Sequence, residues 1–138
     1  MTQPAADFPG MYLDKVRKAL DEARAVVKIE LPEAAGRAAY LAACHAAQAL
    51  IFERTGKIAK THSGVRSEFA RLAKDDPRID RAFPVFLAQA YNLKSVADYA
   101  VGADVGVTLE EADEAIVKAA RFVDRVAALL LESSGGAP

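Results

Sequence analysis

The sequence has little of what most catalytic and metal-binding sites require. Its 138 residues include one cysteine, two histidines and no tryptophan. The single Cys44 cannot form an internal disulfide, and its Ala-rich surroundings are typical of a small buried side chain. Phosphate-binding glycine loops, dinucleotide fingerprints and paired-cysteine metal spacings are missing. A carboxylate di-metal site in a helical bundle needs a Glu three residues before a His, which neither His45 nor His62 has. We therefore expect no metal and no cofactor.

An excess of one charge and long apolar runs are also lacking. Eighteen Lys and Arg against nineteen Asp and Glu give a formal net charge of −1, so the molecule as a whole does not attract nucleic acid or anionic lipid. No stretch approaches the ~18 apolar residues of a membrane-spanning helix, and the first ten residues lack the order of a signal peptide. We expect a cytoplasmic protein with no membrane partner.

The remaining composition is that of one globular domain. Hydrophobic residues make up 52% and charged residues 27% of the chain, and 138 residues leave no room for a second core. We expect a flexible N-terminus over residues 1–10, a single domain over residues 11–132 and a flexible tail over residues 133–138, because both ends are rich in Pro, Gly or Ser.

Apolar residues recur at steps of three and four along most of the domain, which is typical of amphipathic helices. This spacing, with Pro, Gly and Asp as stop signals, predicts five helices over residues 11–30, 32–54, 63–74, 79–100 and 108–131. We expect Ser63 to cap the third helix, while Thr108-Leu109-Glu110-Glu111 matches a capping box that opens the fifth. The expected fold is all-α, an antiparallel bundle of four long helices and one short one.

The second and fourth predicted helices each carry a polar cluster. On the second, Tyr40 lies one turn after Arg37, and His45 lies on a neighbouring face. His45 is either a site residue or an interior histidine satisfied by a hydrogen bond. On the fourth, Lys94 and Asp98 are four residues apart and can form an ion pair, and Tyr99 is adjacent. The alternative is an exposed ion pair that contributes little to stability. Buried polar groups need partners, so we expect Tyr40, His45 and Asp98 to converge.

A third cluster lies in a basic segment, residues 54–74. This segment holds six Lys and Arg against one Glu, a net charge of +5. Its first part, with Lys57, Lys60, His62 and Arg66, is suited to receive a phosphate beside a helix N-terminus. A solvated charged loop is the competing interpretation.

The order of these residues resembles that of HEPN-domain proteins (higher eukaryotes and prokaryotes nucleotide-binding). The stretch Arg37-Ala-Ala-Tyr40-Leu-Ala-Ala-Cys-His45-Ala-Ala-Gln-Ala-Leu50 is similar to the family's Arg-x-x-Tyr-x-x-x-x-His-Ala-x-x-Ala-Leu element. Thr61-His62-Ser63-Gly64 and Leu93-Lys94-Ser-Val-Ala97-Asp98-Tyr99 resemble its Ser-His-Ser-Gly and Leu-Arg-x-x-Ala-Asp-Tyr elements. The resemblance covers about residues 12–130. It implies a helical bundle that is often dimeric, so we expect a homodimer, formed through the Ala-rich faces of the second and fourth helices.

The resemblance also implies a function. Many members are encoded beside a minimal nucleotidyltransferase as toxin–antitoxin or stress-response modules, and many of the toxins are metal-independent ribonucleases with an Arg, four to six residues, then a His. Here Lys94 replaces the expected Arg and no His follows it, while Arg37 to His45 and Arg54 to His62 each enclose seven residues. The motif is therefore not present in its usual form.

The leading hypothesis is a domain that recognises a nucleotide or RNA and has a nucleotidyltransferase as its partner protein. Its ligand-binding residues would be Arg37, Tyr40, His45, Lys57, Lys60, His62, Lys94, Asp98 and Tyr99. Two alternatives remain open: an RNA endonuclease that uses His45 or His62 with Arg37, and a non-catalytic dimerising scaffold.

Overall fold

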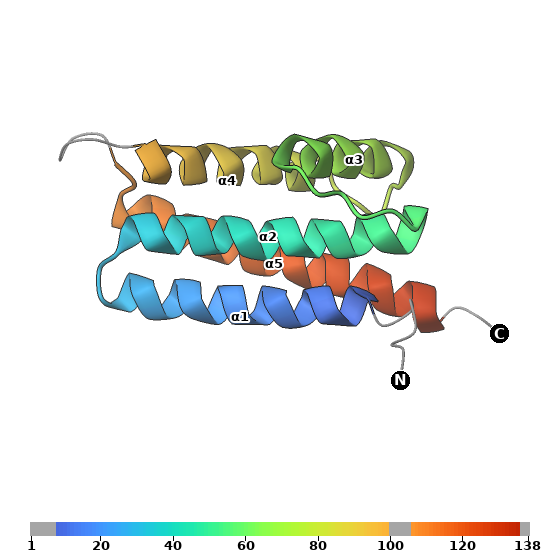
Figure 1. The fold of residues 1–138 in the computed structure, drawn as a ribbon, viewed down its shortest axis with the longest axis horizontal. Coiled ribbons are helices and arrows are strands. Elements are labelled where there is room, and N and C mark those ends of the chain that lie inside the picture. Colours follow the sequence, from blue (N-terminus) through green and yellow to red (C-terminus); the bar gives the residue numbers. More distant parts are fainter. Residues whose placement is uncertain (1–7, 100–105, 136–138) are drawn as a thin grey trace.

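The computed structural model describes residues 8–99 and 106–135, and the side chains of residues 10–99 and 106–132. Its five helices are α1 (Phe8–Lys28), α2 (Pro32–Thr55), α3 (His62–Asp75), α4 (Ala82–Tyr99) and α5 (Leu109–Gly135). In Figure 1, α2 lies at the centre with α1 on one side, α5 behind it, and α3 and α4 in a row on the other side. The described residues contain no strand. The prediction of an all-α bundle with four long helices and one short one is confirmed.

α1 begins earlier and α5 ends later than the sequence predicted. α1 begins at Phe8 and α5 continues to Gly135, so residues 8–10 and 133–135 are helical. The rest of the predicted flexible ends, residues 1–7 and 136–138, lies outside the described residues. No helix in the described part of the chain is long and apolar enough to cross a membrane.

α2 is the core of the bundle because its side chains are small. Eight of its alanines are buried: Ala35, Ala38, Ala39, Ala42, Ala43, Ala46, Ala47 and Ala49. Since alanine allows neighbouring backbones to approach closely, α2 packs against each of the other four helices. These alanines pack against helices of the same chain. The Ala-rich face of α2 is therefore covered and cannot form the dimer contact that the sequence suggested.

Local signals in the sequence explain where α2 and α5 begin and end. Pro32 occupies the first turn of α2, and Gly56 ends the helix in the left-handed conformation with a φ of 72°. The predicted capping box of α5 is confirmed by two reciprocal bonds: the amide of Glu111 donates to the Thr108 hydroxyl (3.1 Å) and the amide of Thr108 donates to the Glu111 carboxylate (3.0 Å).

The start of α3 differs from the prediction by one residue. Thr61, and not Ser63, caps the helix, because its hydroxyl accepts a hydrogen bond from the amide of Gly64 at 2.9 Å. α3 therefore begins at His62, which places this histidine in the first turn, beside α2.

The start of α4 is also later than predicted. Residues 76–81 form a turn rather than helix: the amide of Ile79 donates to the carbonyl of Asp76 (3.0 Å), and the amide of Ala82 donates to the Asp80 carboxylate (2.8 Å). The helix begins at Ala82, so Pro84 falls in its first turn, where no amide donor is needed.

Candidate functional site

The centre of the candidate site is a hydrogen bond between α2 and α3. The hydroxyl of Tyr40 lies 2.6 Å from Nδ1 of His62. Tyr40 is fully buried, whereas His62 is exposed at the surface. The bond therefore joins the interior of the bundle to a solvent-facing imidazole.

An aromatic platform from α4 supports this histidine. The ring of Tyr91 lies 5.4 Å from the ring of His62 and 5.6 Å from that of Tyr40, centroid to centroid. The guanidinium of Arg66, one turn after His62 on α3, stacks over the Tyr91 ring at 4.0 Å. One nitrogen of Arg66, Nη1, is buried and has no hydrogen-bond partner among the described residues.

A group of charges lies beside this platform. The ammonium of Lys94 is 2.7 Å from one carboxylate oxygen of Asp98, and the guanidinium of Arg37 is 3.6 Å from the other. Arg37 also donates to the carbonyl of Ala97 at 3.2 Å, which ties α2 to the end of α4. These seven residues, Arg37, Tyr40, His62, Arg66, Tyr91, Lys94 and Asp98, are called the His62 cluster below.

The electrostatics of the cluster keep His62 neutral and Tyr40 protonated. Burial of part of the ring, and then the cations Lys94 and Arg66, lower the pKa of His62 against the opposing effect of Asp98. Burial raises the pKa of Tyr40 well above its ordinary value. Tyr40 is therefore protonated and His62 neutral at pH 7, and the two share one hydrogen bond at Nδ1, which leaves Nε2 facing away from Tyr40.

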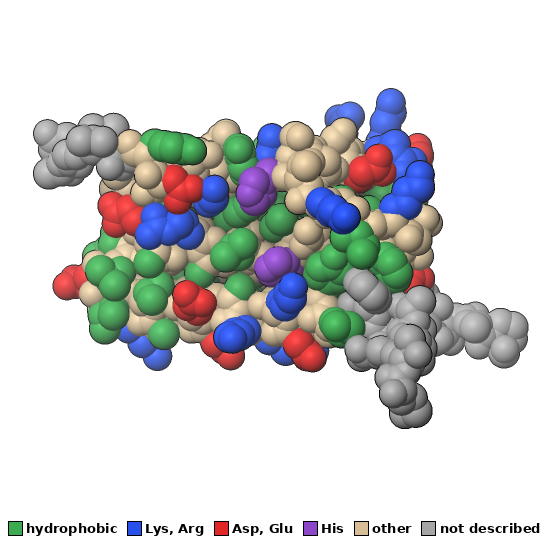
Figure 2. Space-filling view, viewed as in Figure 1, with side chains coloured by type: hydrophobic (Ala, Val, Ile, Leu, Met, Phe, Trp, Pro, Cys, Tyr) green, Lys and Arg blue, Asp and Glu red, His purple; other side chains and the backbone are tan. Residues whose placement is uncertain are grey.

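His45 does not belong to this cluster. The prediction that His45 converges with Tyr40 and Asp98 is therefore wrong. Nδ1 of His45 is hydrogen-bonded to the side chain of Gln48 (2.8 Å), and its ring lies 6.3 Å from that of Tyr12 on α1. The reason is geometric: His45 is five residues after Tyr40, which turns it about 140° around α2. Figure 2 shows the two histidines at separate places on the face in view.

The remaining predicted ligand residues, Lys57, Lys60 and Tyr99, lie at the surface on the α2–α3 link and on α4. Lys57 and Lys60 are exposed in the link between α2 and α3, and Tyr99, at the end of α4, is 81% exposed. Lys57, Ile58 and Ala59 of the link line one side of a pocket of ≈ 390 Å³, and Ile51 of α2 lines another. Lys and Arg side chains gather over α3 and this link in Figure 2.

Part of the basic segment's charge is already paired. The guanidinium of Arg54 lies 3.1 Å from the carboxylate of Asp76, and that of Arg71 lies 2.7 Å from Glu68. The charges left for a ligand are therefore fewer than the net charge of the segment suggests.

Comparison with known proteins identifies the family. The HEPN domain family model matches residues 11–129. The chain belongs to the HEPN domain family. A candidate toxin of Methanocaldococcus jannaschii is similar to it, with 33% identity over 94 residues that span 68% of this chain and 67% of the relative.

Two residues of the cluster in this HEPN domain were not among the predicted ligand residues: Arg66, which the sequence placed only in the basic segment suited to a phosphate, and Tyr91. Two spacings could have signalled their roles: Arg66 follows His62 by four residues on α3, and Tyr91 precedes Lys94 by three on α4, so each shares a helix face with a cluster residue. Within the described residues, no group of His, Cys, Asp and Glu is arranged to hold a metal ion.

Proposed function

We propose that this HEPN domain binds phosphate groups of a nucleotide or an RNA strand at the His62 cluster. In this proposal it is the toxin-like component of a cytoplasmic toxin–antitoxin or stress-response module, with a minimal nucleotidyltransferase as partner protein. The similarity to a candidate toxin supports the module, and the resemblance of its motifs to those of nucleotidyltransferase-linked members supports the partner.

One observation carries the proposal: the exposed, neutral His62 is oriented by a buried tyrosine and lies among cations. In this proposal the Tyr40 hydroxyl donates to Nδ1, so the imidazole proton lies on Nε2 and can donate to a phosphate oxygen. Arg66 adds the positive charge of the guanidinium that stacks on Tyr91, and Lys94 adds a positive charge that Asp98 neutralises only in part, since Arg37 also shares Asp98. Phosphate oxygens accept such charge-assisted hydrogen bonds strongly.

The first prediction concerns the pH dependence of RNA binding. A bound phosphate stabilises the imidazolium, so it raises the lowered pKa of His62. The affinity for a short single-stranded RNA should therefore increase as pH falls from 8, beginning at the pKa of the bound state and levelling off below that of the free state. The gain is about tenfold for each unit by which the ligand raises this pKa. Fluorescence anisotropy between pH 8 and 5.5 measures it.

His62→Gln should remove this pH dependence, because glutamine does not titrate. His45→Gln is the matched control and should retain it, since His45 is bonded to Gln48 away from the cluster. RNA phosphodiesters do not titrate in this pH range, so a change in the slope of log affinity against pH comes from a group of the protein. An equal pH dependence in wild type and His62→Gln would refute the assignment.

The second prediction concerns the α2–α3 link. If Lys57 and Lys60 each contact one phosphate, replacing both by alanine should flatten the slope of log affinity against log salt concentration by up to ~1.4. The free energy of unfolding should change by less than about 0.5 kcal/mol, because both side chains are exposed. The control is the alanine double variant of Lys18 and Lys28, which are exposed on α1. An unchanged slope would mean that the link is only a solvated surface.

The wild type and the two histidine variants also distinguish ligand binding from the two alternatives, an RNA endonuclease and a non-catalytic scaffold. The exposed His62 beside Lys94 is also suited to acid–base cleavage of RNA without a metal. Oligonucleotide that is cut in the presence of a chelator by wild type and by His45→Gln, but not by His62→Gln, would establish an endonuclease centred on His62. The absence of both binding and cleavage would favour the scaffold.

A further inference from the structure

The pocket beside the α2–α3 link has apolar walls. Residues of α2, the link and α3 line it, and its volume is ≈ 390 Å³, within the ~300–1,000 Å³ that is typical of ligand sites. Ile51 of α2 is 1% exposed and belongs to the core, whereas Ile58 of the link is 41% exposed. This pocket is called the link pocket below. Its isoleucines can contact a flat apolar ring.

Hydrogen bonds to α2 hold the wall that the link contributes. The hydroxyl of Thr55 accepts a hydrogen bond from the amide of Lys57 at 3.1 Å. The side chain of Gln48 donates to the carbonyl of Ala59 at 2.9 Å. The backbone on both sides of Ile58 is therefore fixed to α2. A ligand meets a wall that is already in place, so little ordering is needed when it binds.

Charged side chains border the apolar walls of the link pocket. Lys57 lines it, and Lys60 is exposed three residues later on the link. On α3, Arg71 donates to Glu68 through Nε at 3.2 Å and Nη2 at 2.7 Å, and both bonds end on one oxygen, Oε2. Two cations and one carboxylate line the pocket, a net charge of +1. An anionic group is therefore attracted to this rim.

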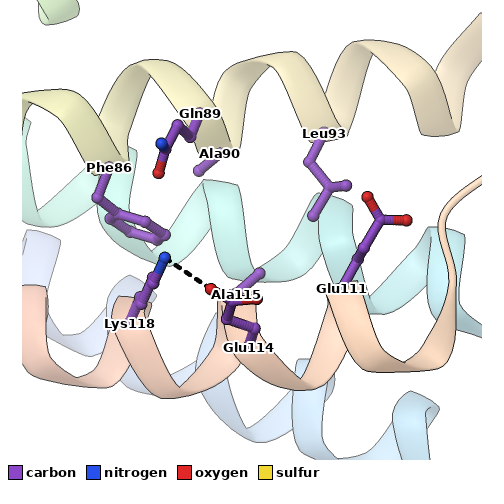
Figure 3. Close-up of a pocket in the computed structure, with 8 residues that line it drawn as sticks. All are labelled: Phe86, Gln89, Ala90, Leu93, Glu111, Glu114, Ala115 and Lys118. Atoms are coloured by element: carbon purple, nitrogen blue, oxygen red, sulfur yellow. Dashed lines mark ion pairs between the residues drawn. The ribbon is translucent and has the colours of Figure 1, made fainter.

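The hollow between α4 and α5 has the opposite charge. Its volume is ≈ 250 Å³, and in Figure 3 apolar side chains of α4 face charged side chains of α5, with Phe86 and Leu93 opposite Glu111, Glu114 and Lys118. The dashed line marks the ion pair of Lys118 with Glu114 at 2.8 Å. Two carboxylates and one cation give a net charge of −1. This hollow is therefore apolar like the link pocket but repels phosphate.

The link pocket and the His62 cluster lie on different sides of α3. Gly64 and Glu68 line the pocket one turn apart, and Gly64 follows His62 by two residues, about 200° around the helix axis. The backbone from Ile58 to His62 spans at most about 14 Å. A strand that passes around the first turn of α3 can therefore reach both places.

We propose that the link pocket binds one base of an RNA strand, with the neighbouring phosphate at Lys57. A nucleotide combines the two parts that this pocket suits, a flat ring and an anionic group. Ile51 and Ile58 contact the ring, and the second oxygen of Glu68 accepts a hydrogen bond from an N–H group on the base edge. The inference rests on the proposed function, because it names a second part of the same RNA strand.

Fluorescence anisotropy with two oligonucleotides of equal length tests the inference. One is a single-stranded RNA, and the other is an abasic strand with the same number of phosphates. The wild type should bind the RNA about tenfold more tightly, because only the RNA can bury a base in the pocket. Ile58→Ala should reduce this preference to less than about threefold and leave the affinity for the abasic strand unchanged.

The abasic strand also reports on folding, because an unfolded variant would lose its affinity for this strand too. Val117→Ala is the matched control, since Val117 is another β-branched side chain, 51% exposed on α5, and the variant should keep the full preference. Equal affinities of the wild type for the two strands, or an Ile58→Ala variant that keeps the preference, would exclude a base as the occupant and leave the proposed function intact.

The proposed function fails separately from this inference. If Ile58→Ala loses the preference but His62→Gln binds both strands as the wild type does, the base site stands and the assignment of phosphate binding to the His62 cluster is refuted. A wild type that binds neither strand would refute both.

Discussion

Replacing Asp76 by alanine is expected to lower the free energy of unfolding by about 3–5 kcal/mol. Asp76 is only 7% exposed and lies in the turn between α3 and α4. Its carboxylate accepts hydrogen bonds from Nε and Nη2 of Arg78, both at 3.0 Å, and from Nη1 of Arg54 at 3.1 Å. The substitution leaves the largely buried guanidinium of Arg54 without its carboxylate. Urea titration at pH 7 measures the loss, and Asp75→Ala, one residue earlier and exposed, should cost less than about 0.5 kcal/mol.

The pH dependence of this loss follows from the same contacts. The hydrogen bonds from Arg78, more than the cost of burial, hold the pKa of Asp76 well below its ordinary value. A carboxylate of this kind stabilises the fold fully above its unfolded-state pKa of ~3.9, and the contribution declines as pH falls below it. The difference between wild type and Asp76→Ala should therefore be smaller at pH 3 than at pH 7. An equal difference at both values would show that the ion pairs are not its source.

Phe122→Ala is the second substitution with a large expected effect, a loss of about 3–5 kcal/mol. Phe122 of α5 is fully buried, and its ring centroid lies 5.0 Å from that of Phe69 on α3 and 5.7 and 6.1 Å from those of Phe83 and Phe86 on α4. Removing the ring leaves a cavity where three helices meet. The expected readout is a lower urea midpoint at unchanged slope.

Phe122→Leu provides the same test if the alanine variant does not fold. Leucine fills part of the cavity, so its loss should be smaller than that of alanine but measurable. A change below about 0.5 kcal/mol in both variants would contradict the central role of this aromatic contact.

The sequence predicted the helices well because their signals are local. The three-and-four spacing, Pro32, Gly56 and the Thr108–Glu111 box all act within a few residues, and each is confirmed. The cap of α3 shows the limit of such signals. Thr61 and Ser63 are both good capping residues, and only the geometry of the chain shows that the hydroxyl of Thr61 reaches the third amide after it.

The site could be predicted only in part, because it depends on how separate helices face one another. The pairing of Lys94 with Asp98 follows from their spacing on one helix and is confirmed. The partner of Tyr40 does not follow from spacing, since His62 is 22 residues away on another helix. Its position depends on the path of the α2–α3 link, where the side chain of Gln48 donates to the carbonyl of Ala59 at 2.9 Å. Nothing in the sequence pattern ranks His62 above His45.

The hydrogen bond between Tyr40 and His62 links folding and the candidate site at position 62. If α3 moved away from α2, the buried hydroxyl of Tyr40 would lose its bond to His62 and keep the weak acceptor Cys44, at a cost of about 1–3 kcal/mol. The side chain at position 62 therefore holds the first turn of α3 against α2, and in the proposed function it also presents a donor to the solvent. Folding therefore limits which residues position 62 accepts, whether or not the cluster binds a ligand.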